Sequence, residues 1–261
     1  MKTFFTKASC GLLIALISTV STVNTIIAQT PPVKDSTMCN TAKGQFCARQ
    51  LIIPGVLIGY GFAGLNSHWL KELNRDIRDR VRSDIDERIT IDDISRYVPV
   101  VSVYALNAAG VKGRHGFKDR TIILATSFIL VNSTVLSLKS LISAKRPDGS
   151  SDNSFPSGHS ATAFAGAEFL WQEYKDVSLW YGIGGYIIAT GTGIFRIYND
   201  RHWLTDVAAG AGIGILGTKA AYWLNPYLSR KLFGCDKKKT TMHFAPFYDG
   251  THTGCVLALH F

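Results

Sequence analysis

The stretch Lys139–His159, KSLISAKRPDGSSDNSFPSGH, decides how this chain can fold, because its polar loop separates two apolar, helix-like runs. The loop is basic and closes on a Pro-Ser pair, which is a helix start signal. The first turn of a helix offers free N–H groups and the positive end of the helix dipole. Cations next to such a turn predict a phosphate site. The cations and the closing residues are Lys139, Lys145, Arg146 and Pro156–His159.

A second polar stretch, Arg196–Asp206, lies downstream between two further apolar runs. It supplies one more cation, a second histidine at 202 and a carboxylate four residues after that histidine. Residues four apart on a helix are neighbours on its surface, so Asp206 is expected to reach the ring of His202.

These pieces, K-x6-R-P, then P-S-G-H, then R-x5-H-x3-D, resemble the type-2 phosphatidic acid phosphatase family, which shares its site with the vanadium haloperoxidases. Three motifs in the right order are a specific signal, whereas one alone would be weak. The resemblance covers roughly residues 97–222. Phe195 departs from it, because the family usually has Ser there, so one hydroxyl contact is missing. The matching residues are Lys139, Arg146, Pro147, Pro156, Ser157, Gly158, His159, Arg196, His202 and Asp206.

The resemblance implies a catalytic role for three of these residues. His202 is the nucleophile that forms a phosphohistidine, and Asp206 orients its ring. His159 is the general acid for the leaving oxygen. Cations surround the phosphate, so no metal and no cofactor are expected.

The resemblance also implies a phosphate-binding set. Two arginines suit two phosphate oxygens each, and a lysine adds a third charge. A serine hydroxyl and a glycine N–H add neutral donors. Three other charges in the motifs, Lys145, Asp148 and Arg201, are interpreted as solvated loop charges. The phosphate-binding residues are Lys139, Arg146, Ser157, Gly158 and Arg196.

The composition limits the class of protein. The 261 residues are 46% hydrophobic with a formal charge of +9 and a mean hydropathy of +0.12. A basic balance indicates nucleic acid, an anionic membrane surface or phosphorylated substrates. Because no nucleic-acid motif is present, we expect a lipid phosphate substrate and a membrane as partners. The oligomeric state stays open.

The N-terminus is typical of a secretory signal peptide, residues 1–28, with two lysines, an apolar core and a cleavage point after Ala28. An exported chain could oxidise its cysteines, so disulfides and free thiols are both open. A zinc site is disfavoured, because no cysteine has a partner at metal spacing. The cysteines that remain after cleavage are Cys39, Cys47, Cys235 and Cys255.

The predicted fold is all-α: a helical bundle with partly membrane-embedded helices, plus a short C-terminal β-hairpin around Asp249-Gly250. Small residues at 208–217 predict close helix contacts. The division is residues 1–28 signal peptide, 29–96 leader and amphipathic helix, 97–224 phosphatase core and 225–261 tail. The helices expected in the core are 97–111, 121–138, 160–173, 179–195 and 204–224.

Three features before the core are less regular. Leu51–Leu65 has Pro54 and four glycines and is short for a bilayer span. Ser67–Arg88 carries one apolar stripe, which indicates a solvated helix packed on the bundle or a helix on the membrane surface. Thr90 and Asp93 have the spacing of a capping box.

The sequence leaves several functions open. A lipid phosphatase is favoured, with lipid A phosphate, isoprenoid pyrophosphate or phosphatidate-type substrates. It would sit in the inner membrane with a periplasm-facing site, because excluding Leu51–Leu65 leaves an even number of crossings between Gln29 and Lys139. The alternatives are a soluble periplasmic acid phosphatase, a vanadate-dependent haloperoxidase and a non-catalytic membrane scaffold. The intact His159, His202 and Asp206 argue against the scaffold.

Overall fold

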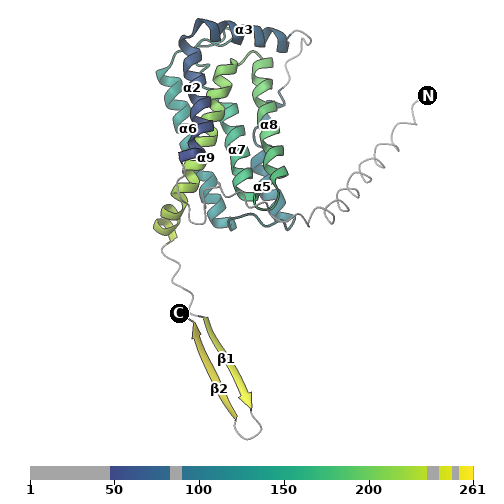
Figure 1. Ribbon diagram of the computed structural model, residues 1–261, viewed down its shortest axis with the longest axis vertical. Helices are drawn as coiled ribbons and strands as arrows, with labels where there is room; N and C mark the ends of the chain where they lie inside the picture. The colour runs from purple at the N-terminus through teal and green to yellow at the C-terminus, as the bar shows by residue number, and fades with distance from the viewer. Residues whose placement is uncertain (1–47, 83–89, 234–240, 249–252, 261) are drawn as a thin grey trace, which may run out of the picture. The chain divides into compact units, whose positions relative to one another are not determined.

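The computed structural model describes residues 48–82, 90–233, 241–248 and 253–260 (Figure 1). The predicted signal peptide, residues 1–28, lies outside the described residues, as do Cys39, Cys47 and Cys235. The export signal and the disulfide pattern therefore stay predictions.

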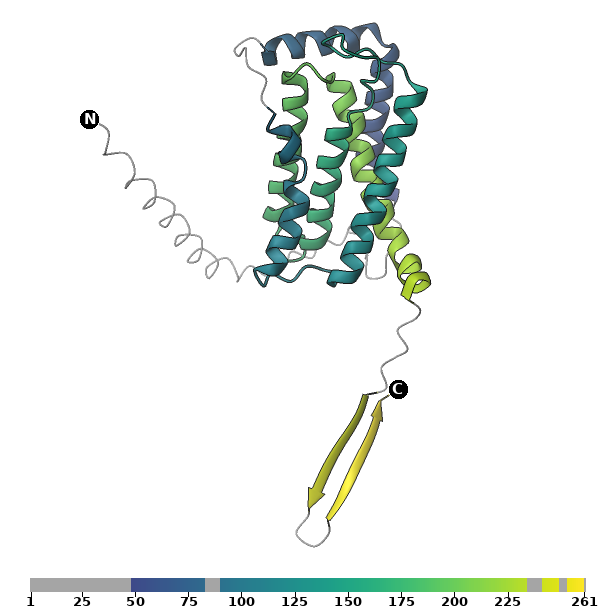
Figure 2. The same ribbon diagram turned by 180° about the vertical axis from the view of Figure 1, so that it is seen from behind.

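The described residues 48–82 and 90–233 form a helical bundle, which confirms the all-α class of the core. Figures 1 and 2 show α2, α6 and α9 side by side, and α7 packs against α5, α6, α8 and α9. A short 3₁₀ turn, η1 (Ala48–Leu51), leads into the first long helix. The helices are α2 (Ile52–Asn66), α3 (His68–Arg82), α4 (Asp92–Ser95), α5 (Val98–Ala108), α6 (Phe117–Leu141), α7 (Gly158–Tyr174), α8 (Leu179–Tyr198) and α9 (Leu204–Phe233).

Small residues place α7 at the centre of the bundle. Its alanines at 161, 163, 165 and 167 are almost completely buried. A Cβ at Gly210 of α9 would overlap the carbonyl oxygen of Ser157, and one at Gly214 would overlap that of Ala161. These glycines let two backbones touch, so the predicted close contact is confirmed.

Helix α2 corrects the expectation for Leu51–Leu65. With the preceding 3₁₀ turn it spans Ala48–Asn66, which is 19 residues and apolar enough to cross a membrane. Its buried glycines do not break it, because a Cβ at Gly61 would meet Ala209 and one at Gly64 would meet Thr205. They are packing positions against α9.

The direction of α2 changes the predicted count of crossings. Gln50 lines a cavity with Arg114 and Asn225, whereas Gly64 lines another with Ile142 and Asp206. Helix α2 therefore runs from the far end of the bundle to the end that carries the motifs. If α2 crosses a membrane, the count of crossings before Lys139 rises by one.

Helix α3 lies across the motif end of the bundle in both views (Figures 1 and 2). The side-chain amide of Asn74 donates to the hydroxyl of Thr205 at 2.9 Å, and Arg78 Nε donates to Asp200 at 2.6 Å. Leu70, a residue of α3 itself, is buried. The amphipathic stripe is thus the packed face of a helix on the bundle, and its predicted end at Arg88 lies outside the described residues.

The capping box predicted at Thr90 and Asp93 is wrong. Helix α4 begins at Asp92 without a side-chain cap, and Asp93 donates its backbone N–H to the carbonyl of Thr90. The carboxylate of Asp93 is engaged by His159 instead.

Two helices are longer than expected. Helix α6 begins at Phe117, four residues early, because the Arg120 side chain is buried against Glu173 and so need not face water. Helix α9 continues through Pro226 to Phe233, past the predicted boundary at residue 225.

Near the C-terminus, β1 (Thr241–Tyr248) pairs antiparallel with β2 (Thr253–His260). The turn predicted at Asp249-Gly250 lies outside the described residues, and so the C-terminal hairpin as a unit stays a prediction.

Candidate active site

The ring of His202 is fixed between α8 and α9. Its side chain is 3% exposed, and Nδ1 lies 2.8 Å from the carbonyl oxygen of Ser154. A carbonyl only accepts, so the ring proton sits on Nδ1 and the lone pair on Nε2. Burial lowers the pKa of His202 to about 4, against the pull of Asp206 and with the repulsion of Arg196. The ring is therefore neutral at ordinary pH and Nε2 is free to attack.

Asp206 does not hold that ring in the way its spacing predicted. Its Oδ2 is 3.8 Å from Nδ1 of His202, too far for a hydrogen bond. The same oxygen accepts from the Ser154 hydroxyl at 2.5 Å and from the backbone N–H of Trp203 at 3.0 Å. Asp206 thus fixes Ser154, and the carbonyl of Ser154 fixes the ring.

Three cations, Lys139, Arg146 and Arg196, converge on the loop before α7. Lys139 Nζ donates to the carbonyl of Asn153 at 2.5 Å. The Nε atoms of Arg146 and Arg196 are buried and have no hydrogen-bond partner among the described residues. Burying a charged donor without a partner is costly, so the cluster favours an incoming anion.

Two of the charges interpreted as solvated form a tie between loops. Arg201 lies 3.4 Å from the carboxylate of Asp148, which is only 11% exposed. The backbone N–H of Asp148 also donates to the carbonyl of Asp200 at 3.3 Å. This tie joins the two motif loops. The sequence could not show that these loops face each other. Lys145 is exposed, as interpreted.

Ser157 is the N-cap of α7, as its Pro-Ser start signal predicts. Its hydroxyl accepts from the N–H of Ser160 at 3.4 Å and is 2.9 Å from the Ser160 hydroxyl. Gly158 opens the helix, and the nearest atom to a Cβ there would be a methyl of Val135 at 3.7 Å. The first turn of α7 therefore has room for a ligand in front of its backbone.

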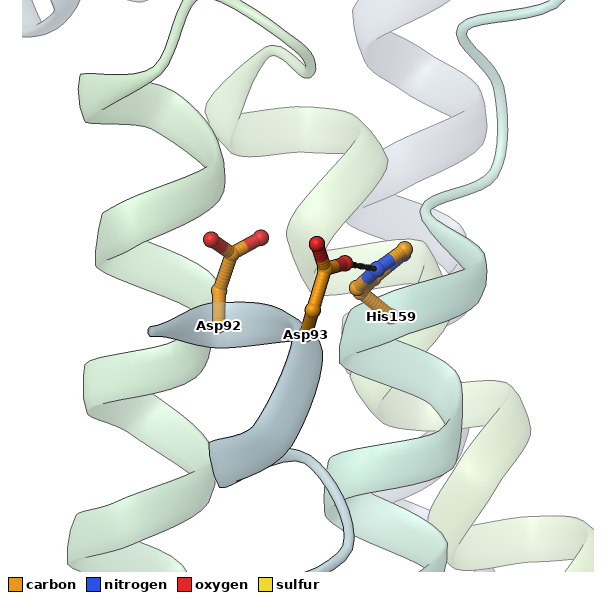
Figure 3. Close-up of side chains that lie close together, drawn as sticks. All are labelled: Asp92, Asp93 and His159. Atoms are coloured by element: carbon orange, nitrogen blue, oxygen red, sulfur yellow. Dashed lines mark hydrogen bonds and ion pairs between the residues drawn. The ribbon is translucent and has the colours of Figure 1, made fainter. Parts of the chain in front are cut away.

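His159 is the second histidine of the site, and acidic residues of α4 approach it (Figure 3). Its Nε2 is 2.7 Å from Oδ1 of Asp93 and 3.0 Å from a guanidinium nitrogen of Arg96. Asp92, beside Asp93, accepts from Arg196 at 2.5 Å. The sequence analysis missed both aspartates, since they precede His159 by more than 60 residues and no local pattern links them.

Asp92, Asp93 and His159 each offer a ligand atom within 4.8 Å of the others. Arg196 already pairs with Asp92, and Arg96 lies against His159. Two guanidinium groups at the same place disfavour a further cation. The acids serve as partners for the site's own cations.

Phe195 replaces the hydroxyl that the motif usually carries next to Arg196. Its ring packs edge-on against Tyr198, with centroids 6.4 Å apart. The position contributes packing and no donor.

A groove of about 420 Å³ opens from the site between α6, α7 and the two residues that precede α5, Arg96 and Tyr97. Polar site residues line one part of it and apolar side chains the rest. A second cavity of about 540 Å³ lies on the other side, under α3 and against Asp206. The lining of the groove is Arg96, Tyr97, Phe128, Asn132, Val135, Leu136, Lys139, Gly158, His159 and Thr162.

Residues 120–230, which hold all the predicted site residues, match the family model of the PAP2 superfamily. Among relatives, the chain is 37% identical over 170 residues to the lipid A 1-phosphatase of Porphyromonas gingivalis, a match that covers 65% of this chain. It is 37% identical over 79 residues, 30% of this chain, to the bacitracin transport permease protein BcrC of Bacillus licheniformis. The matches span 37% and 36% of the length of these two relatives. The crystal structure of Aquifex aeolicus LpxE aligns with a TM-score of 0.45 at 23% identity, covering 57% of this chain and 94% of that one.

Proposed function

We propose that this protein is a metal-independent phosphatase of the PAP2 type that hydrolyses lipid phosphates through a phosphohistidine. The observation that carries the proposal is the groove between α6, α7 and the residues just before α5, where Lys139 and His159 meet the apolar side chains of Phe128 and Leu136. A phosphate at the cations would leave a hydrocarbon chain in that apolar part. A soluble phosphate ester has no hydrocarbon chain to occupy the apolar part of the groove.

The outer surface of the bundle supports a membrane location. Helices α2 and α6 are both long and apolar enough to cross a membrane, and only 17% and 22% of their apolar windows are buried. Core helices of soluble proteins hide such faces, since large exposed apolar patches are rare. Large exposed apolar side chains on α2, α6 and α8 are Ile52, Ile53, Val56, Ile129, Leu136, Leu141, Trp180 and Ile187.

The arrangement of the site supports a first chemical step in which His202 attacks phosphorus. Lys139, Arg146 and Arg196 neutralise the phosphate oxygens that would repel a nucleophile. The Nε2 lone pair of His202 forms the P–N bond, and His159 protonates the leaving oxygen. The carbonyl of Ser154 keeps the proton of His202 on Nδ1 throughout.

In the second step water attacks the phosphohistidine and gives its proton to the now neutral His159. The P–N bond breaks and its electron pair returns to Nε2 of His202. The three cations stabilise charge in both steps, and so a metal ion is not needed.

The name of the Porphyromonas relative supports lipid A phosphate as the first substrate to test, with isoprenoid pyrophosphate and phosphatidate next. Phosphate release from these lipids and from soluble phosphoesters, in detergent, is the test. We expect lipids to be hydrolysed much faster. Equal rates on soluble esters without detergent would favour a soluble acid phosphatase, and halide oxidation with added vanadate would favour a haloperoxidase.

We propose that the site faces the periplasm. Basic residues at the far end of the bundle support this, because positive segments stay cytoplasmic. Lys112, Arg114, Arg230 and Lys231 belong to that end. Because α2 begins there, the proposal requires Ala48 to be cytoplasmic. If the signal peptide were cleaved and Gln29 lay in the periplasm, α2 would begin on the periplasmic side. The site would then face the cytoplasm.

A cysteine at Ser151, in a background without native cysteines, tests the orientation. An impermeant thiol reagent should label it in intact spheroplasts, while a cysteine at Lys112 should react only after lysis. The reverse pattern would place the site in the cytoplasm.

A further inference from the structure

The imidazole of His159 is held by a residue outside the three sequence motifs. Oδ1 of Asp93, on α4, is 2.7 Å from Nε2 of the ring (Figure 3). The segment that matches the family begins at residue 120, so α4 lies outside it. Nothing in the motif pattern assigns a role to Asp93.

Helix α4 is docked on the site by contacts of its own. Asp92, which is 1% exposed, accepts from Arg196 at 2.5 Å. The hydroxyl of Ser95 is 2.8 Å from that of Thr192 on α8. These contacts hold the four-residue helix from both ends, and the position of Asp93 follows from them.

Charge makes the contact chemically useful. Burial disfavours the protonated form of His159, the guanidinium groups of Arg196 and Arg96 add to this effect, and Asp92 is already paired with Arg196. Asp93 is the carboxylate that contacts the ring directly, so it offsets this effect. A general acid must be protonated before it can act.

We propose that Asp93 is a positioning residue for the general acid. In the protonated ring Nε2 carries a hydrogen, which Asp93 accepts, while Arg96 can only donate and so makes no hydrogen bond to Nε2 in this state. The contact with Asp93 stabilises the imidazolium and leaves Nδ1 to give its proton to the leaving oxygen. The inference rests on the proposed phosphatase function and adds a residue to it.

In this step one bond to phosphorus forms and another breaks. The lone pair of His202 Nε2 forms a bond to phosphorus while the bond from phosphorus to the leaving oxygen breaks. The electron pair of that bond goes to the leaving oxygen, which takes the Nδ1 proton of His159. The Nε2–H of His159 stays hydrogen-bonded to Asp93, and His159 ends neutral.

Leaving-group dependence tests the proposal, since only a poor leaving group needs the proton. For Asp93→Asn we expect kcat on an alkyl lipid phosphate to fall about 100-fold, the lower end of what general acid catalysis supplies. On an aryl phosphate with an acidic phenol, kcat should change little. The alkaline limb of kcat/KM on the lipid should also move to lower pH, because the imidazolium has lost its carboxylate.

Three variants complete the experiment. Asp176→Asn, an exposed acid on the turn after α7, should match the wild type. Asp92→Asn should lower turnover of both substrates to a similar extent, because Asp92 holds Arg196, which binds the phosphate that both substrates share. Asp93→Glu keeps the carboxylate, so its rate on the alkyl lipid phosphate should lie between those of Asp93→Asn and the wild type. This variant also tests whether position 93 tolerates a change of side-chain length.

An equal loss on both substrates for Asp93→Asn, or an unmoved alkaline limb, would make Asp93 a structural residue of α4 and overturn the inference while the phosphatase function stands. Absence of phosphate release by the wild type from either substrate would remove the proposed function, and the inference with it.

Discussion

The two ends of the bundle carry two clusters of buried charge that differ in one respect. At the far end Arg120 pairs with Glu173 at 3.3 Å, and Lys219 pairs with Glu168 at 2.6 Å. At the motif end Arg196 pairs with Asp92 at 2.5 Å, whereas Arg146 has a buried Nε without a hydrogen-bond partner and no carboxylate partner among the described residues. The two cations of the far cluster each have a carboxylate partner in the folded chain, although Arg120 Nη1 is itself buried without a hydrogen-bond partner among the described residues. In the motif-end cluster, Arg146 would gain a charged partner only when an anion binds.

We infer from this difference that Arg120 has a structural role and that Arg146 has a role in binding an anion. A buried cation with a carboxylate partner stabilises the fold, and losing either partner leaves an uncompensated charge. A buried cation without a partner reduces stability and increases affinity for an anion. Substitutions at the two ends should therefore have opposite effects on stability and activity.

The largest effect is expected for His202→Ala. The nucleophile is lost, and phosphate release should fall to the background rate while the cations still bind phosphate. Phosphate release by the purified, folded variant is the measurement. A near-normal rate would show that another group attacks phosphorus.

A matched pair of variants, Arg146→Gln and Arg120→Gln, tests whether the buried cations at the two ends of the bundle differ in their effects on activity and stability. The first should abolish most activity with no loss of thermal stability, because it removes an unpaired buried charge. The second should lower the free energy of unfolding by about 3 kcal/mol, since the buried carboxylate of Glu173 loses its guanidinium partner and keeps only His115 and Tyr222, and it should leave the rate of the folded fraction intact. Thermal melts and rates in the same detergent measure both. Equal destabilisation by the two variants would contradict the distinction.

Asp206→Asn should slow turnover by orders of magnitude, as in other histidine–aspartate pairs, but through Ser154. Ser154→Ala keeps the carbonyl that holds His202 and should have a smaller effect of the same kind. Both should change kcat more than KM. If Ser154→Ala is silent while Asp206→Asn is not, Asp206 acts on the ring directly through its charge.

Vanadate should inhibit, and EDTA should not. Vanadate takes the geometry of the transition state, and the cations of the motif end would bind it tightly. Inhibition should weaken strongly in Arg146→Gln and stay unchanged in Arg120→Gln. Activity that is lost with EDTA and restored by a divalent metal would contradict a site neutralised by the chain's own cations.

The smallest effect concerns pH. Burial lowers the pKa of His202 to about 4, so the neutral nucleophile persists as pH falls through 6.5 and is lost only near 4. The acid limb of kcat/KM should lie near pH 4, after correction for the ionised fraction of the substrate, whose second phosphate pKa is about 6. Because the unfolded histidine binds its proton at higher pH, stability should also fall between pH 6.5 and 4. An acid limb near 6.5 would mean that the ring is solvated.

The sequence by itself was enough to predict which residues make up the proposed site. Motif spacing selected the two histidines, Asp206 and the three cations, because each motif combines a helix start or a helix turn with fixed local geometry. The helical core could also be predicted, since apolar runs and small residues report local structure and close packing.

Only the tertiary structure decided which groups face each other. Asp93 reaches His159 from 66 residues away, and the carbonyl of Ser154 takes the place on the ring that spacing gave to Asp206. Likewise, the glycines of α2 look like helix breakers in the sequence and are contact points in the bundle. Contacts between distant segments follow from how helices pack, and no short-range pattern in a chain encodes them.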